Sequence, residues 1–283
     1  MTCACAIAMP AWPEVALCLR AALLDVAPER RVVACSGGLD SSVLMAGLAR
    51  LHAEEGLPPP RALHVNHGLH PEAAAWAAWT QQRERDVICR VLEVTVERSD
   101  AGLEADARHA RYAALATALA DDDVLLLAHH RDDQAETVLL RLLRGAGPAG
   151  LAGMPATRKL GRGRLLRPLL DMDRSRLEQA ARELEVAVSE DPSNSELRHD
   201  RNFLRHEITS RLAGRWPGYR QTLSRAAELC REQEVALGEL LGPAPVALPV
   251  AALQVTKAVA AVRLRHWLAA AGVTMPARTQ LQY

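Results

Sequence analysis

A six-residue segment, Ser36-Gly-Gly-Leu-Asp-Ser41, has the residue types that phosphate binding requires. It follows a β-branched apolar run that begins at Arg31, and a segment with helical periodicity, Ser42–Leu51, comes directly after it. The two glycines allow a tight turn and let backbone N–H groups approach a ligand, because no Cβ stands in the way. Asp40 and Ser41 are typical of a helix start, so the positive end of the helix dipole faces the same point. Strand, glycine turn and helix N-terminus together predict an anion site suited to phosphate.

Two carboxylates, those of Asp133 and Glu136, form the second candidate site. They are three residues apart, on one face of the helix predicted over Asp132–Arg144. Acidic residues in a first helical turn often only complement the helix dipole. Beside a phosphate loop, however, two carboxylates can hold Mg²⁺ and can orient or deprotonate an attacking amine. We interpret them as functional, because the strand order predicted below brings them to the phosphate loop.

Histidines mark two other predicted strand ends, in the segments His64-Val-Asn-His-Gly-Leu69 and His129-His130. A zinc site needs further ligands, and neither a cysteine nor a carboxylate completes a zinc set there. We therefore interpret these histidines as side chains that shape a nucleotide pocket, with metal binding as the less favoured alternative.

Short apolar runs alternate with helix-length segments in the first half of the chain. The predicted strands are Val32–Cys35, Ala62–Asn66, Ile88–Val96 and Val124–His129. The predicted helices are Ser42–Leu51, Pro71–Arg85, Glu104–Ala120 and Asp132–Arg144. This order predicts an α/β fold with a doubly wound parallel sheet and helices on both faces. Ligands bind at the carboxyl ends of the strands in such sheets, where the phosphate loop, the histidines and the carboxylates converge.

The second half of the chain is rich in loops and helices. Gly145–Gly150 is predicted as a loop and Arg158–Arg164 as a basic, glycine-bearing turn. Later helices are predicted over Met172–Val186 with Asp173 as its cap, Arg201–Leu212 and Tyr219–Leu241. A Trp-Pro-Gly break at 216–218 separates the last two. We therefore predict a catalytic domain over residues 1–215 and the beginning of a helical domain over residues 216–283.

Composition limits the partners and the compartment. Formal net charge is zero, so no global field attracts nucleic acid, although nearly all basic residues are arginines, whose fixed fork suits phosphate. The six cysteines form no CxxC pair and no disulfide framework. No apolar run approaches the roughly 20 residues that a membrane span needs. These features favour a protein of the reducing cytoplasm with no membrane partner; a homodimer stays open.

Five segments stand together in the order and spacing of one enzyme family: SGGLDSSVL, HVNHGLH, LEADARHARY, AHHRDDQAETVLLRLLRGAGPAGLAGM and EDPSNSELRHDRNFLRHEI. From Val32 to Ile208 the chain resembles the tRNA(Ile)-lysidine synthases, pyrophosphatase-loop ATP enzymes with a Rossmann-like fold of the adenine nucleotide alpha hydrolase type. The resemblance implies a ligase that uses ATP and Mg²⁺ to attach free L-lysine to C2 of the wobble cytidine of the tRNA(Ile) with a CAU anticodon. The cytidine is first adenylated, with release of pyrophosphate, and the lysine ε-amine then displaces AMP.

The same resemblance implies roles for individual residues. The ATP-binding residues are Ser36, Gly37, Gly38, Leu39, Asp40 and Ser41. The catalytic residues are Asp40, Arg108, Asp133 and Glu136, with Asp40 and Asp133 as candidate Mg²⁺ ligands. Lysine is cationic at neutral pH, so a nearby carboxylate can bind it and then accept its proton. The residues implied to contact tRNA or another substrate are Arg111, Tyr112, Arg201 and Arg205; a solvated helix face is the alternative for these arginines.

Other functions and one boundary stay open. A tRNA thiolase with the same ATP loop would need a CxxC pair or two cysteines facing the loop, and Cys35 and Cys89 are not obviously so placed. A non-catalytic tRNA-binding module is disfavoured by the intact acidic residues. His70 departs from the polar or basic residue common in the family after HGL. Because the chain stops at Tyr283, soon after a helical segment that begins near Arg263, we expect either a short family member or an incomplete second domain.

Overall fold

The computed structural model describes residues 9–67, 87–99, 102–186 and 199–273. The predicted helix Pro71–Arg85, as well as His70 and the DPSN segment at 191–194, lie outside the described residues. None of the described helices is both long enough and apolar enough to cross a membrane.

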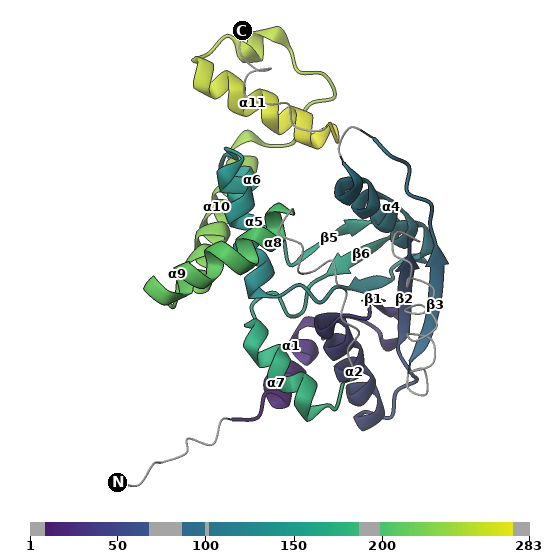
Figure 1. The fold of residues 1–283 in the computed structure, drawn as a ribbon. Coiled ribbons are helices and arrows are strands. Elements are labelled where there is room, and N and C mark those ends of the chain that lie inside the picture. The colour runs from purple at the N-terminus through teal and green to yellow at the C-terminus, as the bar shows by residue number, and fades with distance from the viewer. Residues whose placement is uncertain (1–8, 68–86, 100–101, 187–198, 274–283) are drawn as a thin grey trace.

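A six-stranded sheet forms the centre of the molecule, with the strand order β3-β2-β1-β4-β6-β5 (Figure 1). The strands are β1 Arg31–Cys35, β2 Arg61–Asn66, β3 Ile88–Glu93, β4 Val124–Leu126, β5 Thr157–Leu160 and β6 Gly163–Leu166. All neighbouring pairs are parallel except β5 and β6. The chain leaves β1 in one direction for β2 and β3, then returns to β4 on the other side. The doubly wound α/β prediction is confirmed, and the topological switch lies between β1 and β4.

Two predictions about strands were wrong. Arg158–Arg164, expected to be a turn, supplies most of the β5–β6 hairpin. Its polar residues are typical of an edge strand, which faces solvent on one side and so lacks an apolar signal. The predicted strands Ile88–Val96 and Val124–His129 end earlier, at Glu93 and Leu126. Residues 127–129 instead line the cavity described below.

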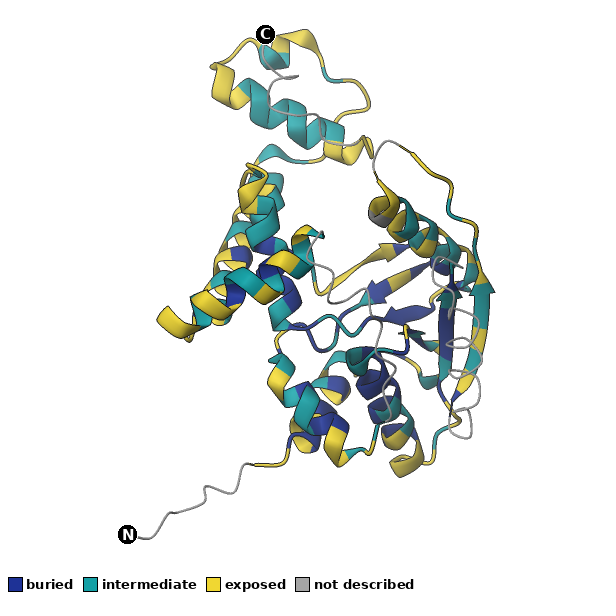
Figure 2. Ribbon diagram, in the orientation of Figure 1, coloured by how far each residue is buried: buried dark blue, intermediate teal, exposed yellow. Residues whose placement is uncertain are grey.

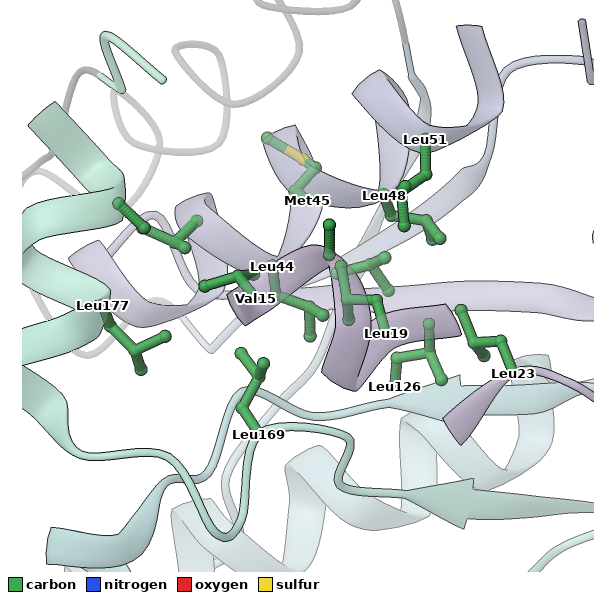
Figure 3. Packing of buried hydrophobic residues seen from close by; sticks show 14 of the residues in the cluster. Val15, Leu19, Leu23, Leu44, Met45, Leu48, Leu51, Leu126, Leu169 and Leu177 are labelled. Carbon is green, nitrogen blue, oxygen red and sulfur yellow. The ribbon is translucent and has the colours of Figure 1, made fainter. Parts of the chain in front are cut away.

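Helices cover both faces of the sheet. On one face pack α1 Trp12–Ala22, α2 Leu39–Glu54 and α7 Arg174–Glu183, and on the other packs α4 Leu103–Ala118 (Figure 1). Figure 3 shows the leucine-rich interior of the first face, where Leu19, Leu44 and Leu48 are fully buried. A Cβ on Gly47 would lie 3.0 Å from the Trp12 ring, so the absence of a side chain there lets α1 and α2 pack closely. This rigid layer fixes the position of the loop between β1 and α2.

Helix α1 was not predicted, because Pro10, Trp12 and Pro13 suggest a break. Its first N–H groups are capped from a distant part of the chain: the Glu183 carboxylate accepts from the backbone N–H groups of Ala11 at 2.9 Å and Trp12 at 2.8 Å. Pro13 lies in the first turn, where a missing N–H is harmless.

A second group of helices lies beside the sheet, on the side away from β3 (Figure 1). It comprises α5 Arg131–Leu143, α6 Pro148–Leu151, α8 Asp200–Phe203, a π-helical turn Leu204–Ile208, α9 Thr209–Arg215 and α10 Tyr219–Leu241. Helix α10 packs against α5 and α6. The predicted helix Arg201–Leu212 is thus interrupted by the π-helical turn, and Met172–Val186 is shorter than predicted. The division into domains at residues 215 and 216 stays a prediction.

The C-terminal part contains a 3₁₀ turn, Val250–Leu253, and helix α11, Lys257–Ala270, which has no buried residue. Figure 2 shows this difference directly: buried residues concentrate in the strands and the facing sides of α1 and α2, whereas α11 is intermediate or exposed.

Candidate active site

The phosphate loop is shaped by its own hydroxyl groups. The Ser41 hydroxyl accepts from the Ser36 backbone N–H at 3.2 Å and donates to the Gly38 carbonyl at 3.0 Å. Gly37 has a φ of +83°, a left-handed conformation that favours glycine. Helix α2 begins at Leu39 with Gly38 as its N-cap, three residues before the predicted start, and no side chain caps it. The first N–H groups of α2 therefore have no side-chain acceptor at the N-cap, and the predicted anion site at this helix N-terminus stays a prediction.

A cavity of about 310 Å³ opens at the carboxyl ends of β1, β2 and β4. Its volume is that of a small-ligand site. The predicted site residues that line it are Ser36, Gly38, Asp40, Ser41, Arg111, Tyr112 and Asp133. Side chains of β2 and β4 complete the wall, among them His64, Asn66, His67 and His129. Phosphate loop, histidine strand ends and one predicted carboxylate thus share a single cavity.

His130 links the phosphate loop to the acidic pair. Its ring is buried, with Nε2 at 3.5 Å from Asp40 Oδ2 and 3.4 Å from Asp133 Oδ2. The Asp133 backbone N–H donates to His130 Nδ1 and the Asp133 carboxylate accepts from the His130 N–H, which forms a capping box at the start of α5. Burial lowers the pKa of His130, but the neighbouring Asp40, Asp133 and Asp132 carboxylates outweigh it and raise this pKa above its usual value.

The pKa of His129 is shifted in the opposite direction. Its Nδ1 accepts a hydrogen bond from the buried Arg167 Nε at 3.1 Å. Burial, together with the nearby guanidinium groups, lowers the pKa of His129 to about 3, although Asp133 opposes the shift. His129 is therefore neutral and presents Nε2–H as a donor. Burial also lowers the pKa of His64 and outweighs the opposing influence of the Cys35 carbonyl, which lies 2.9 Å from His64 Nδ1.

The acidic pair is bound by two arginines from the segment that follows α7. Arg201 donates to Glu136 Oε2 at 2.8 Å and to Asp133 Oδ1 at 2.7 Å. Arg205 donates to Glu136 Oε1 at 2.7 Å and to Asp133 Oδ1 at 3.1 Å. Burial raises the pKa of Asp133, but His130 and Arg201 outweigh it, so this pKa lies below its usual value. We call Asp133, Glu136, Arg201 and Arg205 the acidic centre.

Arg108 and Arg111 lie on the other side of the cavity, on α4. The guanidinium carbons of Arg108 and Arg111 lie 5.2 and 6.0 Å from the centroid of the Tyr112 ring, within cation–π distance. Six of the predicted site residues do not line the cavity itself: Gly37, Leu39, Arg108, Glu136, Arg201 and Arg205. The roles assigned to the predicted site residues stay predictions.

Several supporting residues were missed. Buried Gln134 donates to the Met154 carbonyl at 2.9 Å and accepts from its N–H at 2.7 Å, while Arg141 donates to the Gly150 and Gly153 carbonyls. Together they fix the loop after α5, within the AHHRDDQAETVLLRLLRGAGPAGLAGM segment. Arg167 directly follows β6, at the carboxyl end of that strand. It was missed because residues 158–164 were predicted to be a turn, so no strand was expected before it.

Comparison with known proteins agrees with this geometry. A PP-loop domain matches residues 14–212. The chain is 50% identical over 260 residues to a tRNA(Ile)-lysidine synthase of Alkalilimnicola ehrlichii, covering 88% of this chain and 58% of that protein. It is 48% identical over 261 residues to a tRNA(Ile)-lysidine synthase of Pectobacterium atrosepticum, covering 89% and 59%. The predicted resemblance is confirmed, and the chain spans a little under three fifths of the length of these two relatives.

Among solved structures, the U34-tRNA thiolase NcsA from Methanococcus maripaludis, with its [4Fe-4S] cluster, has a similar fold. The TM-score is 0.62 with 19% identity, over 78% of this chain and 79% of that one. At this identity the likeness shows the fold alone. The chain belongs to the PP-loop domain family.

Proposed function

We propose that this chain catalyses the ATP-dependent ligation of L-lysine to C2 of the wobble cytidine of the CAU-anticodon tRNA(Ile), as a cytoplasmic ligase. One observation carries the proposal: the phosphate loop and a carboxylate pair meet across His130, whose Nε2 lies 3.5 Å from Asp40 and 3.4 Å from Asp133. This arrangement suits a two-step ligation, in which ATP activates the cytidine at the phosphate loop and the carboxylate pair binds the cationic lysine that attacks it. The names of the relatives agree with this reaction.

The first step is adenylation. The C2 oxygen of cytidine attacks the α-phosphorus of ATP, the bond between the α and β phosphates breaks, and pyrophosphate leaves. The backbone N–H groups at the start of α2 and the uncapped helix N-terminus suit the developing charge on pyrophosphate. Arg111 lines the same cavity and supplies a positive charge. The oxygen at C2 thereby becomes a good leaving group.

The second step is attack of the lysine ε-amine on C2, with AMP as the leaving group. The ammonium form of lysine must lose a proton before it attacks. The pKa of Asp133 lies below its usual value, because the influence of His130 and Arg201 exceeds that of burial. Such a carboxylate binds a cation well but is a weak base. We therefore assign Asp133 and Glu136 first to the binding and orientation of lysine. They accept the proton of the ε-ammonium group once that group has replaced one of the arginines that now contact them.

Mg²⁺ fits the loop side of the site better than the acidic centre. Asp40 Oδ1 is buried and has no hydrogen-bond partner among the described residues. Both oxygens of Asp133 are already engaged, Oδ1 by two arginines and Oδ2 by His130. Mg²⁺ is commonly held by one or two carboxylates plus substrate phosphates, so Asp40 would hold it and the ion would neutralise phosphate charge. In the described part of the chain no group of three or more His, Cys, Asp or Glu side chains is arranged to hold a metal by itself.

The thiolase alternative is not favoured. The described cysteines lie on four different elements and form no disulfide with one another: Cys18, Cys35, Cys89 and Cys230. The sequence of the relatives, rather than the shared fold, separates the two functions.

The experiment is incubation of the chain with ATP, Mg²⁺, labelled lysine and transcribed tRNA(Ile), followed by mass analysis of the nucleosides. Lysine should appear on cytidine, with AMP and pyrophosphate in equal amounts. Transfer of sulfur from a sulfur donor, or ADP and orthophosphate as the stoichiometric products, would contradict the proposal.

A further inference from the structure

Three arginines surround one tyrosine at the edge of the cavity. Besides Arg108 and Arg111, Arg158 of β5 places its guanidinium carbon 5.1 Å from the centroid of the Tyr112 ring. Arg158 belongs to none of the five segments that carry the family resemblance. It lies 46 residues beyond Tyr112, in the segment expected to be a turn. We call Arg108, Arg111 and Arg158 the arginine rim.

The strand geometry explains why Arg158 joins this cluster. Alternate residues of a strand point to the same face, so Arg158 and Leu160 share one face of β5. Leu160 is buried in the cluster against which Tyr112 packs. Lys159 therefore points to the opposite face. The same edge strand thus offers two neighbouring exposed cations, only one of which faces Tyr112.

Two members of the arginine rim, Arg108 and Arg158, carry positive charge that no carboxylate of the described residues pairs with. Burial lowers the pKa of Arg167, and Arg158 and Arg108 lower it further, which is the sign of a positive local field. Neighbouring like charges cost free energy, and an anionic ligand would remove that cost.

The position of the rim indicates which anion it receives. The phosphate loop already provides donors for the ATP phosphates, and neither Arg108 nor Arg158 lines that cavity. Both side chains are exposed. A nucleic acid fits this arrangement, because one of its bases can enter the cavity while its backbone phosphates lie over the edge.

We propose that Arg158 is a further nucleic-acid-binding residue, which together with Arg108 binds a backbone phosphate of the tRNA while the target base enters the cavity. This inference rests on the proposed function for the identity of the nucleic acid. The contact is electrostatic and positions the substrate without reading its sequence.

The test compares two neighbouring substitutions on one strand. Arg158→Gln and Lys159→Gln each remove one exposed positive charge, so only the face of the strand differs. Binding of transcribed tRNA(Ile) is measured over a range of salt concentrations. Arg158→Gln should weaken binding by about threefold to tenfold at low salt and reduce the slope of log K against log salt by about one, whereas Lys159→Gln should leave both unchanged.

Further controls show whether Arg158 contacts a phosphate of tRNA or of ATP, and whether the substitutions alter folding. The affinity for ATP should be the same in both variants and in the wild-type chain. Arg158→Lys keeps the charge, so the salt slope should return to the wild-type value, and thermal unfolding should report the same midpoint for all three. Loss of ATP affinity in Arg158→Gln, equal tRNA binding by the two Gln variants, or a reduced slope in Arg158→Lys would each overturn the inference.

These readouts do not require catalysis. If the wild-type chain binds tRNA but transfers no lysine, the proposed function fails while the salt slope still tests Arg158. If lysine is transferred and the two Gln variants bind alike, only the role of the arginine rim fails.

Discussion

The phosphate loop and the acidic centre lie against the same cavity but are constructed in opposite ways. In the loop, the hydrogen bonds of Ser36, Ser41 and Ser42 reach residues no more than five positions away. In the acidic centre, carboxylates on α5 meet guanidinium groups 65 to 72 positions later in the chain. The loop is therefore specified by local sequence, whereas the acidic centre exists only when α8 and the π-helical turn pack on α5.

The two regions also differ in charge. The loop presents N–H donors and leaves a helix N-terminus open to an anion. The acidic centre presents carboxylates whose charge is already balanced by two arginines. An anion can enter the first region directly, but a cation entering the second must share or replace existing ion pairs. Substitutions in the acidic centre should therefore affect both chemistry and folding, and those in the loop mainly nucleotide binding.

The largest expected effect is on lysine transfer. Asp133→Asn and Glu136→Gln keep the shape of each side chain and remove its charge, so each should lower the rate of transfer by about 10² or more. Asp200→Asn is the matched control, because this carboxylate lies beside Arg201 in the chain but pairs with Arg144 on the surface. Initial rates with labelled lysine measure all three. Turnover close to wild type in both acidic-centre variants would show that these carboxylates have no role in the reaction.

The second effect is on stability and tests whether the acidic centre acts as a unit. Arg205→Gln should lower the free energy of unfolding by about 2 kcal/mol, because it leaves the buried Glu136 carboxylate short of a partner. Adding Glu136→Gln should cost less than the sum of the two single changes. Arg144→Gln, which breaks an exposed pair, should change stability by less than about 1 kcal/mol. Urea denaturation provides these values, and additive losses would mean that the pair is not coupled.

The third effect concerns the loop. Gly37→Ala places a Cβ on a residue with φ at +83° and should cost about 1–2 kcal/mol, with weaker ATP binding. Gly38→Ala is the matched control for the backbone, since its φ is −73° and the nearest atom to a new Cβ is the Ser36 hydroxyl at 3.6 Å. Its free energy of unfolding should change little. Equal destabilisation by the two substitutions would show that the positive φ of Gly37 is not the reason for a glycine at this position.

The same contrast explains what could be predicted from sequence. Strands β1 and β2 and the phosphate loop follow from consecutive residues, and all three lie within one or two residues of the prediction. The cap of α1 by Glu183 could not be predicted, because 172 positions separate the carboxylate from Ala11. Arg201 and Arg205 are predicted to share one helical face, but their pairing with α5 depends on tertiary packing. Their predicted contact with tRNA, like the other assigned roles, stays a prediction.

The smallest expected effect separates two adjacent histidines at the junction of the two regions. Stability contributed by His130, whose pKa is raised in the folded state, is fully present below its unfolded pKa and is lost as the pH rises through the folded pKa. His129, whose folded pKa is about 3, acts in the opposite sense: the unfolded chain takes up a proton as the pH falls below about 6.5, so stability declines there.

Urea denaturation between pH 5 and pH 8.5 should therefore distinguish His130→Gln from His129→Gln. The first substitution should remove a decline in stability at the alkaline end, since the carboxylates that raise the pKa of His130, those of Asp40, Asp132 and Asp133, no longer face a ring that titrates. The second should remove a decline at the acid end, since a glutamine can bond to Arg167 without titrating. If both variants changed the same limb of the pH profile, the pKa values of the two histidines would be shifted in the same direction. The two histidines would then not mark a boundary between the phosphate loop and the acidic centre.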